Sequence, residues 1–176
     1  WPIFRESITQ LKAHIPTLQV VIQVPPHLVA RLRRETAGWS IAPLVIDNTE
    51  DKKNLFAAAT AAIAKSGTIG LECALAGLPS IIAYRMNALT ARALRRMITI
   101  KYANLANLLA DRMIIPELIQ EDCTAEKITA QMLPLLTDEL ARDAQRRALA
   151  GVADQLGVND TQSPSEKAAD IIVKLL

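Results

Sequence analysis

The sequence predicts an α/β domain in which helices flank a parallel β-sheet. Of its 176 residues, 51% are apolar but only 3% are aromatic. A core built from Ala, Leu, Ile and Val suits alternating helices and strands better than an all-β sandwich. Short β-branched runs alternate with amphipathic segments in the first half of the chain. Strands joined by single short helices imply right-handed crossovers, which make the strands parallel.

Periodicity and the positions of proline and glycine define the elements of the first half. Residues 2–14 have apolar side chains at near-helical spacing, and Gly77 is expected to end a later helix in the left-handed conformation. The run 18–24 lies between prolines and is expected to be a buried strand. The expected helices are 2–14, 27–36, 50–59 and 68–76, and the expected strands are 18–24, 41–46, 61–64 and 79–84.

After Tyr84 the pattern becomes mostly helical. Residues 157–164 (GVNDTQSP) form the clearest linker, so we divide the chain into a main domain, 1–156, and a linker with a C-terminal helix, 157–176. A doubly wound domain normally opens on a strand, whereas this chain opens on a helix, and we expect the first strand to lie upstream. The expected helices of this half are about 88–98, 104–111, 125–136, 138–155 and 165–176.

Charge and cysteine content exclude several classes of protein. The net charge of +2, from 20 basic and 18 acidic residues, argues against nucleic acid as a partner. Cys73 and Cys123 have no CxxC spacing and no clustered histidines near them, which argues against zinc and against a disulfide framework. No apolar run approaches the roughly 20 residues of a membrane span, and residues 1–20 lack a signal-peptide pattern. We expect a soluble protein of the reducing cytoplasm that can still touch a membrane surface.

The stretch KSGTIGLECALAGLPSIIAYR, residues 65–85, carries the clearest chemical signal. Ser66, Gly67 and Thr68 stand between an expected strand and an expected helix, where ligands of open parallel sheets bind. Gly67 allows close backbone approach, the hydroxyls exchange hydrogen bonds, and the helix start presents free N–H groups, which together suit a diphosphate. Glu72 lies one turn deeper on the same face, where its carboxylate suits the hydroxyls of a ribose.

The same residues also fit a plainer interpretation. Ser-Gly-Thr before a helix is an ordinary N-cap, and an acid in an early turn compensates the helix dipole. The stretch lacks the GxGxxG fingerprint and the Walker lysine, which argues against classical dinucleotide or ATP binding. From the residues alone, a diphosphate site and a capped helix both stay open.

Two longer motifs resemble a known family. SGTIGLECALAGLPSIIAYR, followed by KYANLANLLADRMIIPELIQED, resembles the C-terminal half of bacterial lipid-A-disaccharide synthase, an inverting glycosyltransferase of the GT-B fold. The family pattern reads approximately SGTxxLExxLxxxPxVVxYR and later YxSLPNLLAxRxxxPELLQE, and the similarity extends from WPIF to the C-terminal helix. The resemblance implies a Rossmann-like domain that binds a UDP-sugar, with no metal and no cofactor.

The resemblance also implies a reaction in lipid A biosynthesis. UDP-2,3-diacylglucosamine would donate its sugar to 2,3-diacylglucosamine 1-phosphate, releasing UDP. The implied UDP-sugar-binding residues are Ser66, Gly67, Thr68, Glu72, Tyr84 and Arg85, with Asn107 and Gln120 as active-site support.

Arg85 and Asn107 have the chemistry that this role requires. A fixed cation such as Arg85 and an uncharged donor such as Asn107 suit diphosphate binding and departure of UDP. The alternatives are a surface or helix-capping role for Arg85, a cap of the helix 104–111 for Asn107, and an ordinary exposed position for Gln120.

Members of the resembling family are about twice as long as this chain. The resemblance places the general base in the absent N-terminal domain, so we expect this chain to be inactive alone. The helix 165–176 would pack on that domain, or its apolar side would drive formation of a homodimer. The segment 89–101 reads as a basic amphipathic helix suited to the inner-membrane surface, or as a solvated helix packed on the sheet.

Two other classes of function stay open. Another GT-B enzyme that uses UDP-GlcNAc, such as a peptidoglycan transferase or a 2-epimerase, would share the Ser-Gly-Thr and Glu pattern but not NLLADR and PELIQED. In a non-catalytic α/β interaction domain, the stretch 65–85 would contain only a capped helix.

Overall fold

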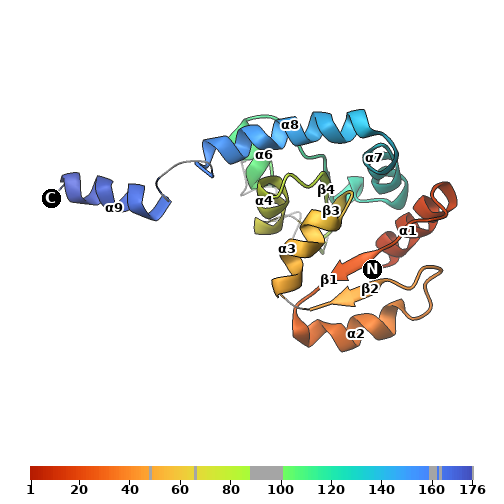
Figure 1. Cartoon of the computed structure of the whole chain (residues 1–176). Coiled ribbons are helices and arrows are strands. Elements are labelled where there is room, and N and C mark those ends of the chain that lie inside the picture. The colour runs from red at the N-terminus through yellow and green to blue at the C-terminus, as the bar shows by residue number, and fades with distance from the viewer. Residues whose placement is uncertain (48, 66, 88–100, 159–161, 163, 176) are drawn as a thin grey trace.

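The computed structural model describes residues 1–47, 49–65, 67–87, 101–158, 162 and 164–175. Helices surround short strands in the body of the molecule, and the last helix extends away from it (Figure 1). The helices are α1 (Pro2–His14), α2 (Pro26–Thr36), α3 (Thr49–Ala58), α4 (Thr68–Leu75), α6 (Leu105–Ala110), α7 (Ala125–Thr137), α8 (Glu139–Gln155) and α9 (Pro164–Leu175). The strands are β1 (Val21–Gln23), β2 (Leu44–Ile46), β3 (Ala62–Ala64), β4 (Ser80–Tyr84) and β5 (Glu117–Ile119), and a 3-10 turn, η1 (Gln120–Asp122), follows β5.

All described strand pairs are parallel, as the sequence predicts. They form two ladders, β1–β2 and β3–β4–β5. Ile63 lies opposite Ile81 in the second ladder, and Ala83 lies opposite Leu118. Because β3, β4 and β5 run the same way, their carboxyl ends meet at one edge, and this edge positions the candidate site.

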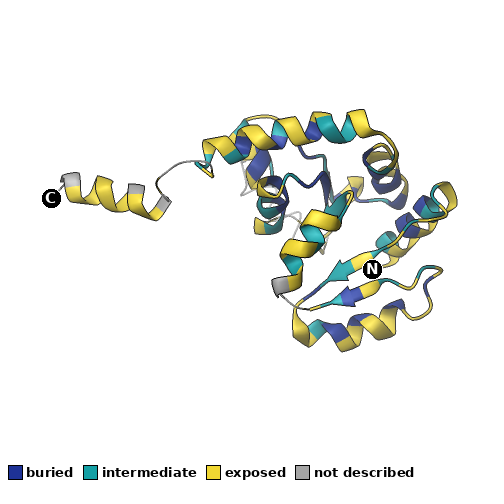
Figure 2. Cartoon of the chain, viewed as in Figure 1, coloured by how far each residue is buried: buried dark blue, intermediate teal, exposed yellow. Residues whose placement is uncertain are grey.

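Two layers of helices cover the ladder of β3, β4 and β5. Side chains alternate between the two faces of a strand. Ile82 therefore faces a cluster that includes Cys73 of α4, Ala106 of α6 and Leu149 of α8. Ile81 and Ala83 face the opposite cluster, which contains Leu11 of α1 and Ile128, Met132 and Leu135 of α7. In Figure 2 the buried segments, in dark blue, are concentrated in the body of the molecule, whereas the described positions of α9 are exposed.

A buried amide joins the start of β4 to α8. The side-chain oxygen of Gln145 accepts a hydrogen bond from the Ser80 N–H at 2.8 Å. Its side-chain nitrogen donates to the Ser80 carbonyl at 3.0 Å and to the Ile114 carbonyl at 2.9 Å. Gln145 thus satisfies backbone groups of β4 and of the segment before β5 that a longer ladder would otherwise pair.

The described helices begin and end close to the predicted residues. Helix α1 spans the predicted 2–14, and Gly77 has the expected positive φ, +63°. The structure adds β5, which the sequence analysis missed within the region predicted to be mostly helical. The predicted helix at 88–98 lies outside the described residues, as do residues 159–161 and 163 of the predicted linker.

The prediction that β1 is a buried strand is wrong. Val21 is 38% exposed, and Leu44, its partner on β2, is 63% exposed. Among the described strands, β1 pairs only with β2, so one of its edges has no ladder partner. By contrast β4, which is paired on both sides, is buried from Ser80 to Ala83. A β-branched run between prolines predicted the strand correctly but not its burial.

Candidate functional site

The first turn of α4 begins at the carboxyl edge of β3 without a side-chain cap. Its N-cap residue is Gly67, which has φ +123° and ψ −154° and no side chain that could accept a hydrogen bond from the helix start. Backbone of this kind is essentially restricted to glycine. A Cβ built on Gly67 would meet no atom within 4 Å, so the space above it is open. The uncapped N–H groups and the helix dipole therefore favour an anion here.

The Ser-Gly-Thr residues differ in what the structure describes. Ser66 lies outside the described residues. Thr68 is exposed and is the first residue of α4. The N-cap position belongs to Gly67, a residue type that is common at N-caps, so the alternative of an ordinary helix start stays open.

Cationic side chains follow the ends of β3 and β4. Lys65 comes directly after β3, and its Nζ lies 4.8 Å from the centre of the Tyr84 ring at the end of β4. Arg85 follows Tyr84 and is exposed. Arg85 is also close enough to Cys123 for its positive charge to oppose the increase in the pKa of that thiol, which burial causes. These groups give the edge next to Gly67 a positive character.

Glu72 is already paired with a cation. Its carboxylate forms an ion pair with the ammonium of Lys52 on α3, and its side chain remains 40% exposed. The Lys52 ammonium also lies 5.7 Å from the centre of the Phe56 ring. A ribose hydroxyl at Glu72 would therefore share the carboxylate with Lys52. Lys52 is 20 residues earlier in the chain, and its spacing from Glu72 gave no sequence signal.

The thiol of Cys73, the residue after Glu72, is expected to make the stability of the fold depend on pH. Burial, followed by the negative charge of Glu72, raises the pKa of the Cys73 thiol from 9.0 to about 11, while Lys52 opposes the shift. Between these values the unfolded chain loses the proton and the folded chain keeps it. We therefore expect stability to be unaffected by this thiol below pH 9 and to fall above it, by about 2–3 kcal/mol once the pH passes 11.

The comparison with Cys73→Ala isolates this effect from other groups that titrate at high pH. Urea unfolding of both proteins between pH 8 and 11 should show a steeper loss of stability in the unaltered chain. Equal slopes would contradict the assignment. The other cysteine, Cys123, is present in both proteins and cancels in the difference.

Asn107 is fully buried, and its side chain is saturated within the chain. Its Oδ1 accepts from the N–H groups of Ile114 and Ile115, each at 2.9 Å. Its Nδ2 donates to the Ile115 carbonyl and to Oε1 of Glu117, each at 2.8 Å. No amide proton is left for a ligand, so Asn107 supports the chain that leads into β5. The predicted alternative, a cap of this helix, is also wrong, because the cap of α6 is Asn104.

Glu117 connects Asn107 to the chain before α6. Its carboxylate accepts from the N–H of Ala103 at 2.9 Å and from the N–H of Asn104 at 3.0 Å, in addition to the amide of Asn107. Glu117 is part of the motif PELIQED, but its position in the sequence predicted no role for it. Glu117 is the first residue of β5. Its hydrogen bonds therefore fix the start of β5, whose carboxyl end lies at the same edge of the ladder as the candidate site.

Gln120 holds the chain that follows Arg85. Its Oε1 accepts from the N–H of Met86 at 2.7 Å, and its Nε2 donates to the carbonyl of Met86 at 3.4 Å. Gln120 is 9% exposed and has φ +56°. The alternative of an ordinary exposed polar residue is therefore wrong, and the structure places Gln120 as a support for the backbone beside Arg85.

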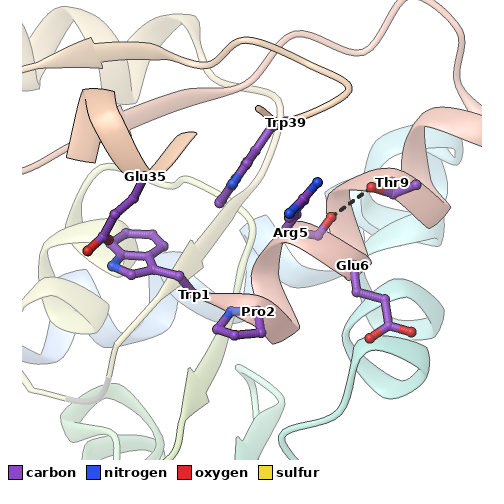
Figure 3. A pocket seen from close by; sticks show the side chains of 7 residues that line it. All are labelled: Trp1, Pro2, Arg5, Glu6, Thr9, Glu35 and Trp39. Atoms are coloured by element: carbon purple, nitrogen blue, oxygen red, sulfur yellow. Dashed lines mark hydrogen bonds between the residues drawn. The ribbon is translucent and has the colours of Figure 1, made fainter. Parts of the chain in front are cut away.

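A cavity of about 570 Å³ lies between α1, the end of α2 and the loop after it. Figure 3 shows two tryptophans, Trp1 and Trp39, among its lining residues, together with the carboxylates of Glu6 and Glu35. The two indole rings contact each other edge to face, with their centres 6.3 Å apart. The guanidinium of Arg5 is engaged with the carbonyl of Gly38 at 3.2 Å. Two carboxylates and one engaged cation do not suit a diphosphate, and none of the predicted site residues lines this cavity.

The described part of the chain contains neither a metal-ligand cluster nor a membrane-spanning helix. Within it, no group of three or more His, Cys, Asp or Glu side chains is arranged to hold a metal ion. None of its described helices combines the length and the apolar character that a bilayer crossing requires.

A solved structure is similar in fold. The glycotransferase of kitacinnamycin superposes with a TM-score of 0.54 and 19% identity, covering 100% of this chain and 40% of that one. At this identity the likeness concerns the fold alone. It agrees with the predicted parallel α/β architecture.

Sequence comparisons identify the family. The pattern of the lipid-A-disaccharide synthetase family matches residues 1–172. The lipid-A-disaccharide synthase of Nitrobacter winogradskyi is 38% identical over 174 residues, which are 99% of this chain and 44% of that protein. Those of Rhodospirillum centenum and Gluconobacter oxydans are 35% and 37% identical over 175 residues, covering 99% of this chain and 43% and 42% of those proteins. The chain thus spans less than half the length of these relatives. On this evidence the chain belongs to the lipid-A-disaccharide synthetase family.

Proposed function

We propose that this chain is the nucleotide-sugar-binding domain of a lipid-A-disaccharide synthase. The reaction would transfer 2,3-diacylglucosamine from its UDP derivative to 2,3-diacylglucosamine 1-phosphate by an inverting mechanism. The observation that carries the proposal is the uncapped start of α4 at Gly67, next to the cationic side chains that follow β3 and β4. Family membership supports the choice of substrates.

Different residues at this edge would bind different parts of the UDP-sugar. The N–H groups at Gly67 and Thr68 would bind phosphate oxygens, and the guanidinium of Arg85 would stabilise the negative charge that develops as UDP leaves. Tyr84 would line the edge beside them, and Glu72 would accept hydrogen bonds from sugar hydroxyls while remaining near Lys52.

Asn107 and Gln120 would act through the backbone. The saturated amide of Asn107 fixes the chain before β5, and Gln120 binds both backbone groups of Met86 directly after Arg85. An enzyme needs its charged groups held in one geometry to stabilise a transition state. These two residues would therefore influence catalysis without touching the substrate.

The rest of the reaction would need groups from outside this chain. A general base must reach the attacking hydroxyl, and we propose that the N-terminal domain of the enzyme supplies it. Helix α9 would pack on that domain or on a second copy, since Ile171, Ile172 and Val173 are each at least 60% exposed. Detection of disaccharide synthesis by the 176-residue chain alone would contradict this division of roles.

The acylated substrates suggest work at the cytoplasmic face of the inner membrane. The basic segment 89–101, predicted to be either a membrane-surface helix or a solvated helix packed on the sheet, lies almost wholly outside the described residues. Flotation of the chain with liposomes, with and without anionic lipid, tests this part of the proposal. Equal recovery with neutral and anionic liposomes would contradict an electrostatic contact.

Calorimetric titration of the chain with UDP tests the binding site. We expect UDP to bind, and we expect Gly67→Ala to weaken binding by about ten-fold, because alanine strains the backbone that aims the first N–H groups of α4. Gly38→Ala is the matched control, since Gly38 has an ordinary φ and open space around it. Absence of binding at millimolar UDP would favour a non-catalytic domain.

Product analysis tests the choice of substrates. The complete enzyme, supplied with acylated and with unacylated UDP-sugars, should form the disaccharide only from the acylated donor. A product from UDP-GlcNAc would instead favour a peptidoglycan transferase or a 2-epimerase.

A further inference from the structure

We propose that Lys65 is a phosphate-binding residue of the nucleotide site and that the ring of Tyr84 holds its ammonium in place. The inference rests on the proposed function and adds to it a residue that the sequence motifs did not single out. It concerns the strength and the ligand preference of the site rather than its location.

The ladder brings Lys65 and Tyr84 to the same edge. Ala64, the last residue of β3, pairs with Ile82 of β4, so both strands end close together. The ammonium of Lys65 lies 4.8 Å from the centre of the Tyr84 ring. A cation over an aromatic face is attracted to it, which limits the positions that the long side chain samples. The ring occupies one side of the ammonium, and the remaining N–H donors stay available.

Lys65 differs from three other described lysines in its partners. The ammonium groups of Lys52, Lys101 and Lys127 each form an ion pair with a carboxylate. Among the described residues, no carboxylate pairs with Lys65, which is exposed. No described carboxylate therefore neutralises its positive charge. The residue stands two positions before the N-cap of α4.

A second, independent feature at the start of α4 is an unused donor. Asn104 is fully buried, and its Nδ2 has no hydrogen-bond partner. This nitrogen is packed against Gly70 in the first turn of α4, only 2.1 Å from the position that a Cβ on Gly70 would take. An unpartnered buried donor is uncommon in folded proteins. The start of α4 thus has one unpartnered buried donor packed against its first turn and the ammonium of Lys65 two positions before its N-cap, while the carboxylate of Glu72 is already paired with Lys52.

A phosphate-binding role of Lys65 predicts that affinity depends on the number of phosphate groups in the ligand. A point charge at Lys65 would act on phosphate oxygens and not on a uracil ring. Its contribution should increase from UMP to UDP and should weaken as salt screens it. A purely structural cation–π contact would instead affect folding stability and leave these ligand preferences unchanged.

The test compares Lys65→Met, which keeps the apolar stem, with the unaltered chain by calorimetric titration of UDP and UMP. We expect UDP binding to weaken by about five- to ten-fold, UMP binding to weaken less, and the dependence of UDP affinity on NaCl to become shallower. Lys65→Arg should recover most of the affinity. Lys53→Ala, an exposed lysine of α3 without an ion pair to a described residue, is the matched control and should bind UDP as the unaltered chain does.

Substitution of Tyr84 tests whether its ring positions the ammonium of Lys65. We expect Tyr84→Leu to weaken UDP binding more than Tyr84→Phe, because phenylalanine keeps an aromatic face under the ammonium. Thermal unfolding of each variant separates loss of binding from loss of the fold.

The outcomes distinguish this inference from the proposed function. If the unaltered chain binds UDP and Lys65→Met binds it equally well at every salt concentration, the role of Lys65 is overturned and the proposed function stands. If the unaltered chain does not bind UDP, the proposed function is overturned, and the role of Lys65 with it.

Discussion

Replacement of Asn107 by alanine is expected to lower the free energy of unfolding by about 3–4 kcal/mol, because each buried backbone group left without its partner costs about 1–3 kcal/mol. The substitution removes all four hydrogen bonds of this side chain at once. The N–H groups of Ile114 and Ile115 and the carbonyl of Ile115, all in buried residues, lose this partner, and Glu117 loses one of the donors to its carboxylate. Urea unfolding followed by circular dichroism gives the difference.

Asn54→Ala is the matched control for this substitution. Asn54 is an exposed residue of α3, and its replacement should change stability by no more than about 0.5 kcal/mol. Asn107→Asp should also be destabilising at neutral pH, since it places a second carboxylate against Glu117, and the loss should shrink as the pH falls and one of the two groups takes up a proton. A cost below about 1 kcal/mol for Asn107→Ala would show that the network is not needed for the fold.

Replacement of Gly70 by alanine is expected to cost about 2–4 kcal/mol of stability, combining overpacking with the loss of a helix cap. The added Cβ would lie 2.1 Å from Nδ2 of Asn104 and 3.0 Å from Cδ1 of Ile82. Both neighbours are fully buried, so neither can move into solvent. The side chain of Asn104 also caps α6 by accepting from the N–H of Ala106 at 2.7 Å, and a shift would break that bond.

Gly151→Ala tests the same exchange in open space. Gly151 lies inside α8, and a Cβ there would meet nothing within 4 Å. Alanine is the better helix former, so this variant should be more stable than the unaltered chain by about 0.5–1 kcal/mol. Opposite signs for the two glycines are the expected result. A neutral Gly70→Ala would mean that α4 and α6 do not pack as closely as described.

The sequence predicted the helices better than the sheet. Helix α7 begins at the residue expected, Ala125, where Thr124 supplies the cap. Strand β5 was missed because it has only three residues, starts with a glutamate and is followed directly by η1. The burial of β1 was also wrong, since periodicity within one strand contains no information about how many neighbours pair with it.

The geometry of the candidate site was predictable where it depends on the local backbone and not where it depends on side chains far away in the sequence, and its role as a UDP site stays a prediction. Gly67 could be identified from its place between a strand and a helix, and its φ of +123° shows why glycine is required. The pairing of Lys52 with Glu72 and the saturation of Asn107 depend on side chains brought together by the fold. Amide side chains at Asn107 and Gln120 looked like ligand donors in the sequence because their backbone partners were unknown.

The contact between α1 and α7 affects the order in which parts of the chain become packed during synthesis. The hydroxyl of Thr129 on α7 donates to the side-chain oxygen of Gln10 on α1 across 119 positions of sequence. At 5–20 residues per second, the ribosome would complete that partner about 6–24 s after α1 itself. During this interval Leu11, which α7 later covers, has no cover from α7. Helix α1 is thus secured only after α7 has been made, and an early stop before α7 would release a chain in which α1 still exposes its apolar face.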